Sequence, residues 1–228
     1  MRLLTTLLIL LVSALAPARA EMPDPANWGA VLSEAQGQTV YFHAWGGEPR
    51  INAYIDWAGD AVEERFGVRV EHVKVSDTAE VVSRVLADKA AGRSDGGRVD
   101  LVWINGENFA AMKEAGLLLP AGWADRLPNY SFVDVEGKPT VASDFTVPVE
   151  GLEAPWGMAK LVFFYDTARV ETPPVSAVAL QDWIADNPGR FTYPQPPDFM
   201  GTTFLKQLMV ELAPDPAAVA QHETLHNH

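Results

Sequence analysis

The sequence predicts an α/β fold, in which a first lobe with a parallel β-sheet and flanking helices is followed by a second, incomplete α/β lobe. Two observations carry this prediction. Up to Gly116, runs rich in β-branched and aromatic residues alternate with stretches of helical spacing, which is the pattern of successive β-loop-α units. The same alternation returns beyond Pro173-Pro174, after a long region rich in proline, glycine and acidic residues.

Three parallel strands are predicted in the first lobe, which we place at residues 21–153. Residues 38–43 and 68–75 are short and rich in β-branched or aromatic side chains. Residues 98–105 carry a nearly continuous apolar run, as expected for a strand that is covered on both faces. Right-handed crossovers between these strands follow from the parallel arrangement.

A helix is predicted after each of these strands. The first has Pro49 in its opening turn and Gly67 at the left-handed position that ends it. Asp77 caps the start of the second helix, and the third helix begins at Gly106. We expect surface loops over residues 117–153.

Residues 154–165 are predicted to cross to the second lobe, and Lys160 to Tyr165 form a strand within this crossover. Residues 166–228 then make a partial second lobe and a carboxyl-terminal tail. The elements predicted there are a helix around Trp183, a strand at 190–193 and a helix at 202–212.

Residues 1–20 are typical of a secretory signal peptide. Arg2 gives a positive start, an apolar run follows, and Ala18-Arg19-Ala20 matches the A-x-A cleavage pattern, so we expect cleavage after Ala20. The apolar run is shorter than the ~20 residues that a membrane-spanning helix needs. These features predict a periplasmic protein.

Composition excludes several classes of function. The 17 basic and 30 acidic residues give a formal charge of −13, which repels phosphate backbones, so we expect no nucleic-acid partner. The absence of cysteine excludes disulfides, thiolate metal sites and cysteine nucleophiles.

Loops at the carboxyl ends of parallel strands are the candidate ligand-binding sites, because ligands of open α/β sheets bind there. Trp45, Gly46, Gly47 and Glu48 follow the first strand. The glycines let the backbone approach a ligand and Trp45 offers a flat aromatic face. The alternative is that the glycines only form the turn and that Trp45 belongs to the core.

Two further loops combine polar side chains with a helix start. One follows the third strand, where simple helix capping is the alternative explanation. The other is a proline-rich loop in the second lobe, where a loop without a ligand is the alternative. Their candidate residues are Asn105, Gly106, Glu107, Asn108, Asp198, Phe199 and Thr202.

Two catalytic patterns occur in the sequence, and each has a structural explanation as the alternative. Residues 92–96 match G-x-S-x-G, but they leave a predicted helix and enter a strand, the reverse of a nucleophile elbow. His222, Glu223 and His226 match H-E-x-x-H, the pattern of a zinc-dependent hydrolase, and this is the alternative function. A solvated tail explains the same residues, so we expect no enzyme, metal or cofactor.

Several tryptophan-containing segments carry a resemblance to a known family. They are residues 37–47 (GQTVYFHAWGG), 51–57 (INAYIDW), 100–109 (DLVWINGENF), 154–157 (APWG) and 193–199 (YPQPPDF). With these segments the chain resembles the periplasmic solute-binding proteins of ABC importers, in the branch called YnjB-like. The resemblance implies a two-lobe periplasmic-binding-protein-like fold of class II, with the ligand trapped between the lobes by hinge closure and Trp156 at the hinge side of the cleft.

The resemblance also implies a small-molecule solute, a permease of an ABC transporter in the inner membrane as the partner, and a monomer. Relatives are considerably longer, so the second lobe is expected to be unfinished and the chain truncated. A non-functional truncated fragment is therefore a further alternative.

The candidate loops favour an organic cation, such as a thiamine-like or polyamine-like solute. Carboxylates at Glu48, Glu107 and Asp198 accompany aromatic faces, an arrangement that attracts cations. The alternative is an anion held at the amino termini of the helices that start near Gly47 and Gly106.

Overall fold

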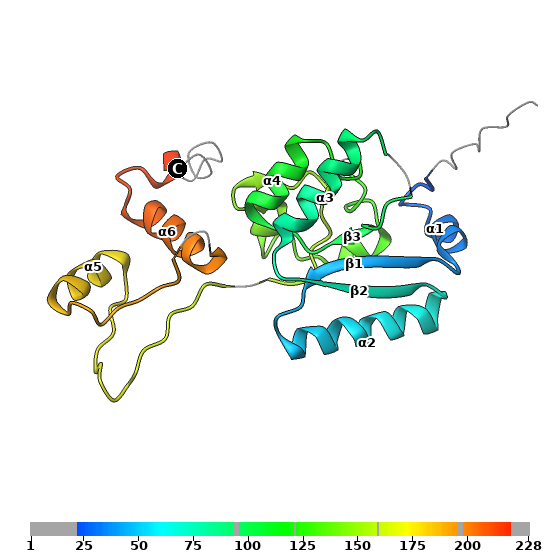
Figure 1. Ribbon diagram of the computed structural model, residues 1–228. Coiled ribbons are helices and arrows are strands. Elements are labelled where there is room, and N and C mark those ends of the chain that lie inside the picture. The colour runs from blue at the N-terminus through cyan, green and yellow to red at the C-terminus, as the bar shows by residue number, and fades with distance from the viewer. Residues whose placement is uncertain (1–21, 94–95, 121, 159, 196–197, 220–228) are drawn as a thin grey trace, which may run out of the picture.

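The structure is a computed structural model that describes residues 22–93, 96–120, 122–158, 160–195 and 198–219 (Figure 1). The predicted signal peptide, the central Ser94-Asp95 of the G-x-S-x-G pattern and the residues of the H-E-x-x-H pattern lie outside these ranges. Within the described residues, none of the helices combines the length and apolar character needed to cross a membrane.

A three-stranded parallel sheet of order β2-β1-β3 forms the centre of the first lobe. β1 (Thr39–Trp45) pairs with β2 (Arg69–Val75) along its whole length, so that Trp45 lies opposite Val75 at the carboxyl edge. β3 (Leu101–Val102) pairs with the middle of β1. The predicted parallel arrangement of these three segments is confirmed.

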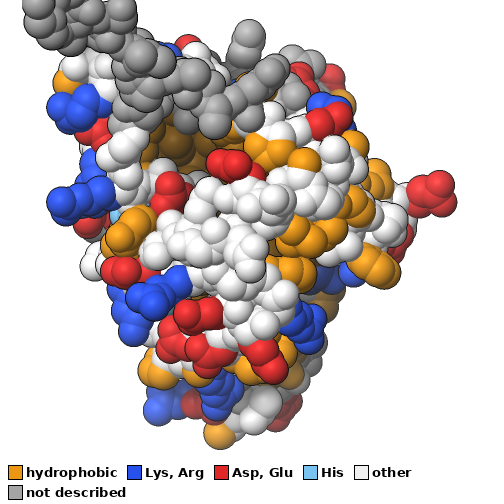
Figure 2. All heavy atoms as spheres, turned by 90° about the vertical axis from the view of Figure 1, so that its right-hand side faces the viewer, with side chains coloured by type: hydrophobic (Ala, Val, Ile, Leu, Met, Phe, Trp, Pro, Cys, Tyr) orange, Lys and Arg blue, Asp and Glu red, His pale blue; other side chains and the backbone are white. Residues whose placement is uncertain are grey.

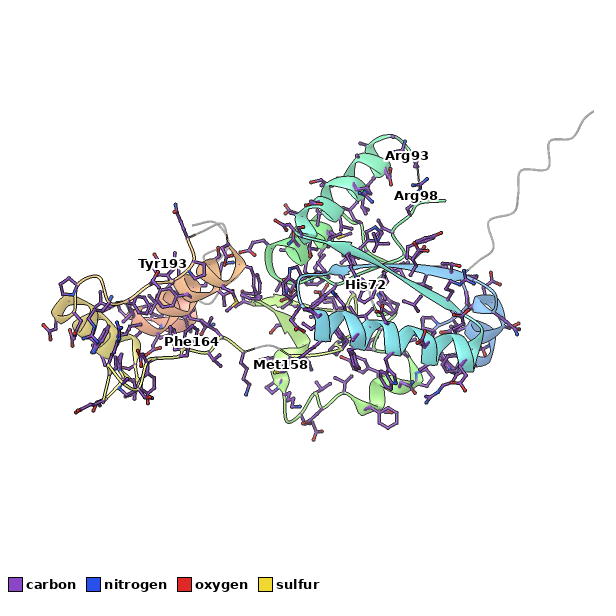
Figure 3. All side chains as sticks on the ribbon, turned by 60° about the horizontal axis from the view of Figure 1, so that its bottom comes forward. His72, Arg93, Arg98, Met158, Phe164 and Tyr193 are labelled. Atoms are coloured by element: carbon purple, nitrogen blue, oxygen red, sulfur yellow. The ribbon has the colours of Figure 1, made fainter. Side chains whose placement is uncertain are left out.

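Helices cover both sides of this sheet. Figures 1 and 3 show α2 (Pro49–Phe66) along one side, and α3 (Thr78–Ala90) with α4 (Gly106–Glu114) on the other. The short helix α1 (Trp28–Ala35) precedes β1. The predicted helix ends are confirmed. Pro49 is the first residue of α2, and Gly67 ends that helix at a φ of 67°. Asp77 accepts a hydrogen bond from the Ala79 N–H at the start of α3.

The core lies between the sheet and these helices. Ile55 of α2 and Val81 of α3 are almost fully buried, and Phe109 of α4 is completely so. His43 on β1 is also buried, and this burial lowers its pKa, which favours the neutral imidazole. Figure 2 shows that acidic and basic side chains are interspersed on the face of the first lobe that forms the right-hand side of Figure 1.

The third strand differs from its prediction. Only Leu101 and Val102 of the expected 98–105 strand are in the sheet, and Leu101 is 44% exposed rather than covered on both faces. Among the described residues, β3 has a hydrogen-bonded neighbour on one side only.

Short elements replace the featureless loops expected at 117–153. Two 3₁₀ turns, η1 (Pro128–Phe132) and η2 (Pro139–Ala142), precede a hairpin of β4 (Ser143–Asp144) and β5 (Val147–Pro148).

The second part of the chain contains helices but no strand among its described residues. These helices are α5 (Ala177–Asp186), α6 (Phe199–Leu212) and the short α7 (Pro216–Val219). α6 begins three residues before the predicted start. Figure 1 shows α5 and α6 set apart from the sheet and joined to it by an extended segment.

The strands predicted at 160–165 and 190–193 are therefore wrong for this structure. Their sequences favour extended backbone, but a strand needs a neighbour to receive its hydrogen bonds. No such neighbour lies beside either segment among the described residues.

Candidate functional site

The carboxyl edge of the sheet holds a small cavity of about 250 Å³. Its lining comes from the ends of β1 and β2 and the residues that follow them, namely Trp45, Gly46, Gly47, Lys74, Val75 and Ser76. Trp45 is 41% exposed, so it is a wall of the cavity and not a core residue. Three of the predicted ligand-binding residues thus line one cavity.

The two glycines bring the backbone close to neighbouring side chains. A Cβ on Gly46 would lie 2.7 Å from the Cβ of Lys74, and a Cβ on Gly47 would overlap the Trp45 ring. The Asn52 Nδ2 donates a 3.0 Å hydrogen bond to the Gly46 carbonyl and fixes the loop from the α2 side. Tight packing therefore requires glycine at both positions.

Glu48 forms the N-cap of α2. Its Oε2 accepts a 2.8 Å hydrogen bond from the Ile51 N–H. The carboxylate thus lies at the positive end of the helix dipole, which it neutralises in part. Glu48 directly follows the two glycines in the sequence, but it is not among the residues that line the Trp45 cavity.

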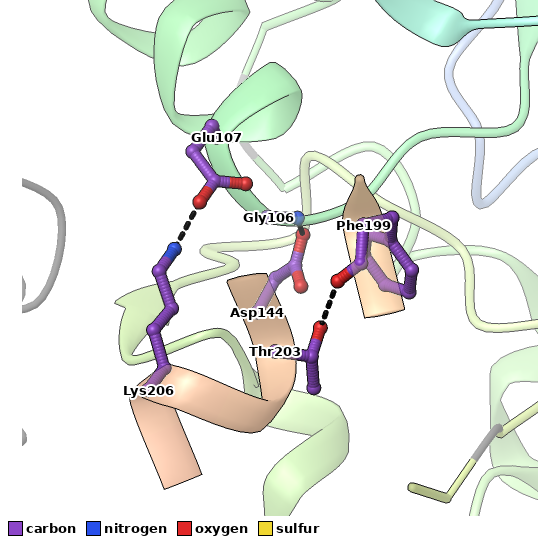
Figure 4. A network of polar contacts seen from close by, with 6 residues as sticks. All are labelled: Gly106, Glu107, Asp144, Phe199, Thr203 and Lys206. Carbon is purple, nitrogen blue, oxygen red and sulfur yellow. Dashed lines mark hydrogen bonds and ion pairs between the residues drawn. The ribbon is translucent and has the colours of Figure 1, made fainter. Parts of the chain in front are cut away.

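The start of α4 is capped by a residue from the β4–β5 hairpin. Asn105 occupies the N-cap position but makes no capping hydrogen bond with its side chain. Instead, the Oδ2 of Asp144 accepts a 2.7 Å hydrogen bond from the Gly106 N–H (Figure 4). Gly106 is buried with a φ of 57°, a backbone conformation that glycine adopts without strain. The alternative that Asn105 serves only as a helix cap is therefore not supported, since its side chain makes no capping hydrogen bond.

The turn of the hairpin is strained. Phe145 and Thr146 have φ values of 42° and 74°, and positive φ costs a non-glycine residue on the order of 1–3 kcal/mol. The Phe145 ring meets Phe199 edge to face at 6.0 Å between centroids, and the Nζ of Lys206 lies 5.5 Å from the Phe145 ring centroid. Contacts with α6 therefore keep the turn of the β4–β5 hairpin in this strained conformation.

Helix α6 lies against the start of α4 through an ion pair. Lys206 is 8% exposed, and its Nζ pairs with the Oε1 of Glu107 (Figure 4). Glu107 and Phe199, which were predicted from separate loops, are thus parts of one contact region. Asn108 lies beside Glu107 in the first turn of α4 and is half-buried.

Asp198 has a local role in α6. Its Oδ1 accepts hydrogen bonds from the N–H groups of Met200 at 2.8 Å and Gly201 at 3.2 Å, which makes it the N-cap. Thr202 follows within the first turn, and its N–H donates to the Asp198 carbonyl. Capping by Asp198 explains why α6 begins earlier than predicted.

Trp156 anchors the crossover to the first lobe. Its ring stacks on Tyr54 of α2 at 6.0 Å and meets Trp103, after β3, edge to face at 4.8 Å. It remains 46% exposed. Trp156 therefore packs on residues of α2 and of the segment after β3, and its partners Tyr54 and Trp103 are not among the predicted residues.

Two half-buried carboxyl groups lie on and after the β4–β5 hairpin. Burial raises the pKa of Asp144 to about 6, against the opposing effect of the Gly106 hydrogen bond. Burial and the nearby Asp144 charge raise the pKa of Glu153 to about 8. Sequence reasoning missed both, and also Phe145 and Lys206, because their roles depend on contacts between distant segments. The described residues contain no group of three or more His, Asp or Glu side chains arranged to hold a metal ion.

Comparison with known proteins places the chain in a family. Residues 57–226 match the family model of the bacterial extracellular solute-binding proteins. Protein YnjB of Escherichia coli (strain K12) is 45% identical over 196 residues, which are 86% of this chain and 50% of that protein. The chain thus spans about half the length of this relative. It belongs to the bacterial extracellular solute-binding protein family.

Proposed function

We propose that the chain is the periplasmic solute-binding component of an ABC importer. It captures a small solute between two lobes and delivers it to a permease in the inner membrane, as a monomer and without bond chemistry. Membership in the family supports this role, and the secretory pattern of residues 1–20 supports the location.

The observation that carries the proposal is the cavity at the carboxyl edge of the parallel sheet. This edge is where α/β proteins bind their ligands, and here it presents the exposed face of Trp45 beside two close-packed glycines. The proposed solute-contacting residues are Trp45, Gly46, Gly47, Glu48, Asn105, Gly106, Glu107, Asn108, Trp156, Asp198, Phe199 and Thr202.

The proposed solute is an organic cation. The amino termini of α2 and α4 already carry carboxylates of the chain itself, from Glu48 and Asp144. An anionic solute at either helix start would meet a negative charge, whereas a cation would be attracted to these groups and to the Trp45 face. Glu107 and Asp198 support this proposal less, because Glu107 pairs with Lys206 and Asp198 caps α6.

The proposal is tested by equilibrium dialysis of the purified chain against a periplasmic metabolite extract, followed by mass spectrometry of the retained compounds. We expect one class of small cationic solute to be enriched with the protein. A Gly47→Leu variant, whose side chain would displace the Trp45 ring, should lose this enrichment. Retention of no compound by the folded wild-type chain would contradict the proposal.

A further inference from the structure

The Trp45 cavity carries a positive charge of its own. Lys74, near the end of β2, is among the described residues that line it, and no aspartate or glutamate is among them. This local charge is opposite in sign to the formal charge of −13 on the whole chain. The cavity therefore differs electrostatically from the rest of the protein.

Three side chains of the lining are hydrogen-bond donors. The Trp45 indole Nε1–H and the Lys74 ammonium can only donate, and the Ser76 hydroxyl can donate or accept. None of the three pairs with another side chain or a carbonyl among the residues that the structure describes. Lys74 and Ser76 are exposed and Trp45 is half-exposed, so a solute can reach all three.

The stem of Lys74 is held in place by Gly46. A Cβ on Gly46 would lie 2.7 Å, 2.8 Å and 3.2 Å from the Cβ, Cγ and Cδ of Lys74, so these three carbons pack along the glycine. The ammonium is only two bonds beyond Cδ and therefore stays beside this wall of the cavity. Because most of the stem is already ordered, binding a ligand at the ammonium costs less entropy.

The acidic residues that flank the lining in the sequence are engaged elsewhere. The Oε2 of Glu48 accepts a 2.8 Å hydrogen bond from the Ile51 N–H and caps α2. The Oδ1 of Asp77 accepts a 2.9 Å hydrogen bond from the Ala79 N–H and caps α3. Neither carboxylate lines the cavity or forms an ion pair with Lys74. The described part of the chain thus supplies no counter-ion for Lys74.

We infer that Lys74, together with the Trp45 N–H and the Ser76 hydroxyl, binds an acidic group of the solute, either a carboxylate or a phosphate. A group of this kind accepts several hydrogen bonds and neutralises the ammonium, which makes these bonds the strong, charge-assisted type. Lys74 is then a residue that determines the specificity of the cavity.

This inference rests on the proposed function, in which the cationic part of the solute lies on the Trp45 face. The solute class is therefore a zwitterion, with a cationic and an acidic group. The Trp45 ring suits both groups, because its face is negative whereas its edge, which includes the N–H, is positive. A solute with a cationic group alone would leave the Lys74 charge without a counter-ion.

The test compares three probes that share a trimethylammonium group. Choline is a cation, glycine betaine adds a carboxylate, and phosphocholine adds a phosphate. In calorimetric titrations of the purified chain, we expect at least one of the two zwitterions to bind about fivefold more tightly than choline, or better. The tighter zwitterion identifies the acidic group. Choline binding as tightly as both zwitterions would overturn the inference.

Matched variants assign this preference to Lys74. Lys74→Met keeps an unbranched stem against Gly46 but removes the ammonium, so it should abolish the preference and leave choline affinity unchanged. Lys74→Arg retains the charge and should retain most of the preference. Lys138→Met removes the same charge at an exposed position outside the lining and should behave as the wild type. A preference that survives Lys74→Met would contradict the role of Lys74.

Inorganic phosphate tests the acidic-group site without any cationic group. We expect phosphate to shift the NMR signal of the Trp45 indole N–H, assigned by its absence from Trp45→Phe, in the wild type but not in Lys74→Met. No shift in the wild type, or an equal shift in both, would overturn the inference. A phosphate shift without binding of choline or either zwitterion would instead contradict the proposed cation function and leave the assignment of Lys74 intact.

Discussion

Asp144 and Gly106, 38 residues apart in the chain, are joined by a 2.7 Å hydrogen bond from the Gly106 N–H to the Asp144 carboxylate. This bond fastens the β4–β5 hairpin to the start of α4 at the carboxyl edge of the sheet. It also places a carboxylate of the chain itself at the amino terminus of α4, a position that otherwise attracts anions.

Removal of this cap should destabilise the first lobe. Asp144→Ala should lower the free energy of unfolding by about 1 kcal/mol, the usual effect of losing an N-cap acceptor. Asp144→Asn keeps a side-chain oxygen for the Gly106 N–H and should lose less. Urea unfolding below pH 3.8, where the Asp144 carboxyl group is protonated in both the folded and the unfolded chain and no charge has to be desolvated, measures both variants. Equal losses would show that the hydrogen bond is not the source of the stabilisation.

Stability should fall as the pH rises, because two half-buried carboxyl groups bind protons more tightly in the folded than in the unfolded chain. The folded pKa values are about 6 for Asp144 and about 8 for Glu153, against ordinary values of 3.8 and 4.5. Their contribution is complete below the ordinary values and is lost as the pH rises through the folded values. Unfolding by urea across this pH range measures the decline.

Glu153→Gln tests the origin of the alkaline part of this decline. The amide cannot ionise, so the loss of stability as the pH rises through about 8 should become shallower. Glu136→Gln, at an exposed position, is the control and should retain the wild-type slope. A Glu153→Gln slope equal to that of the wild type would contradict the assignment.

Trp156→Ala should loosen the crossover. The variant loses the ring contacts with Tyr54 and Trp103, each worth about 0.5–1.5 kcal/mol beyond the buried area. Limited proteolysis should then cut faster within residues 154–166, while Trp156→Phe should restore part of the protection. Phe132→Ala removes a ring that is 85% exposed and should not change the cleavage rate.

Gly201→Ala should destabilise α6, although alanine is the better helix former. A Cβ at Gly201 would overlap the Pro194 carbonyl oxygen, because α6 packs closely on that loop. Gly157→Ala is the matched control, since nothing lies within 4 Å of its added Cβ. Thermal unfolding compares the two variants. A Gly201→Ala variant more stable than the wild type would show that the contact with the Pro194 carbonyl relaxes without a loss of stability.

Local signals in the sequence were sufficient to predict much of the first lobe. Pro49, Gly67 and Asp77 mark helix ends through their own backbone or side-chain chemistry, which needs no distant partner. The candidate residues Trp45, Gly46 and Gly47 could be found because they lie at the end of a recognisable strand and directly after it.

Contacts between distant segments could not be predicted in this way. The 160–165 segment has the composition of a strand, but pairing depends on a neighbour that local sequence does not reveal. Phe145 and Thr146 carry no turn signal because neither is glycine, asparagine or aspartate, and α6 holds their strained conformation from a distance. Asp198 is predicted as a ligand-binding residue from its loop, but its observed hydrogen bonds are those of the N-cap of α6.

The most direct test of the account is a titration of the chain with size-matched cationic, neutral and anionic solutes, followed by tryptophan fluorescence. We predict that a cationic solute binds most tightly and that Trp45→Phe removes most of the signal. Trp183→Phe, a change in α5 outside the Trp45 cavity, should leave the solute response intact. Tightest binding of the anion, or a wild-type response in Trp45→Phe, would contradict the proposal of a cation site at the carboxyl edge of the sheet.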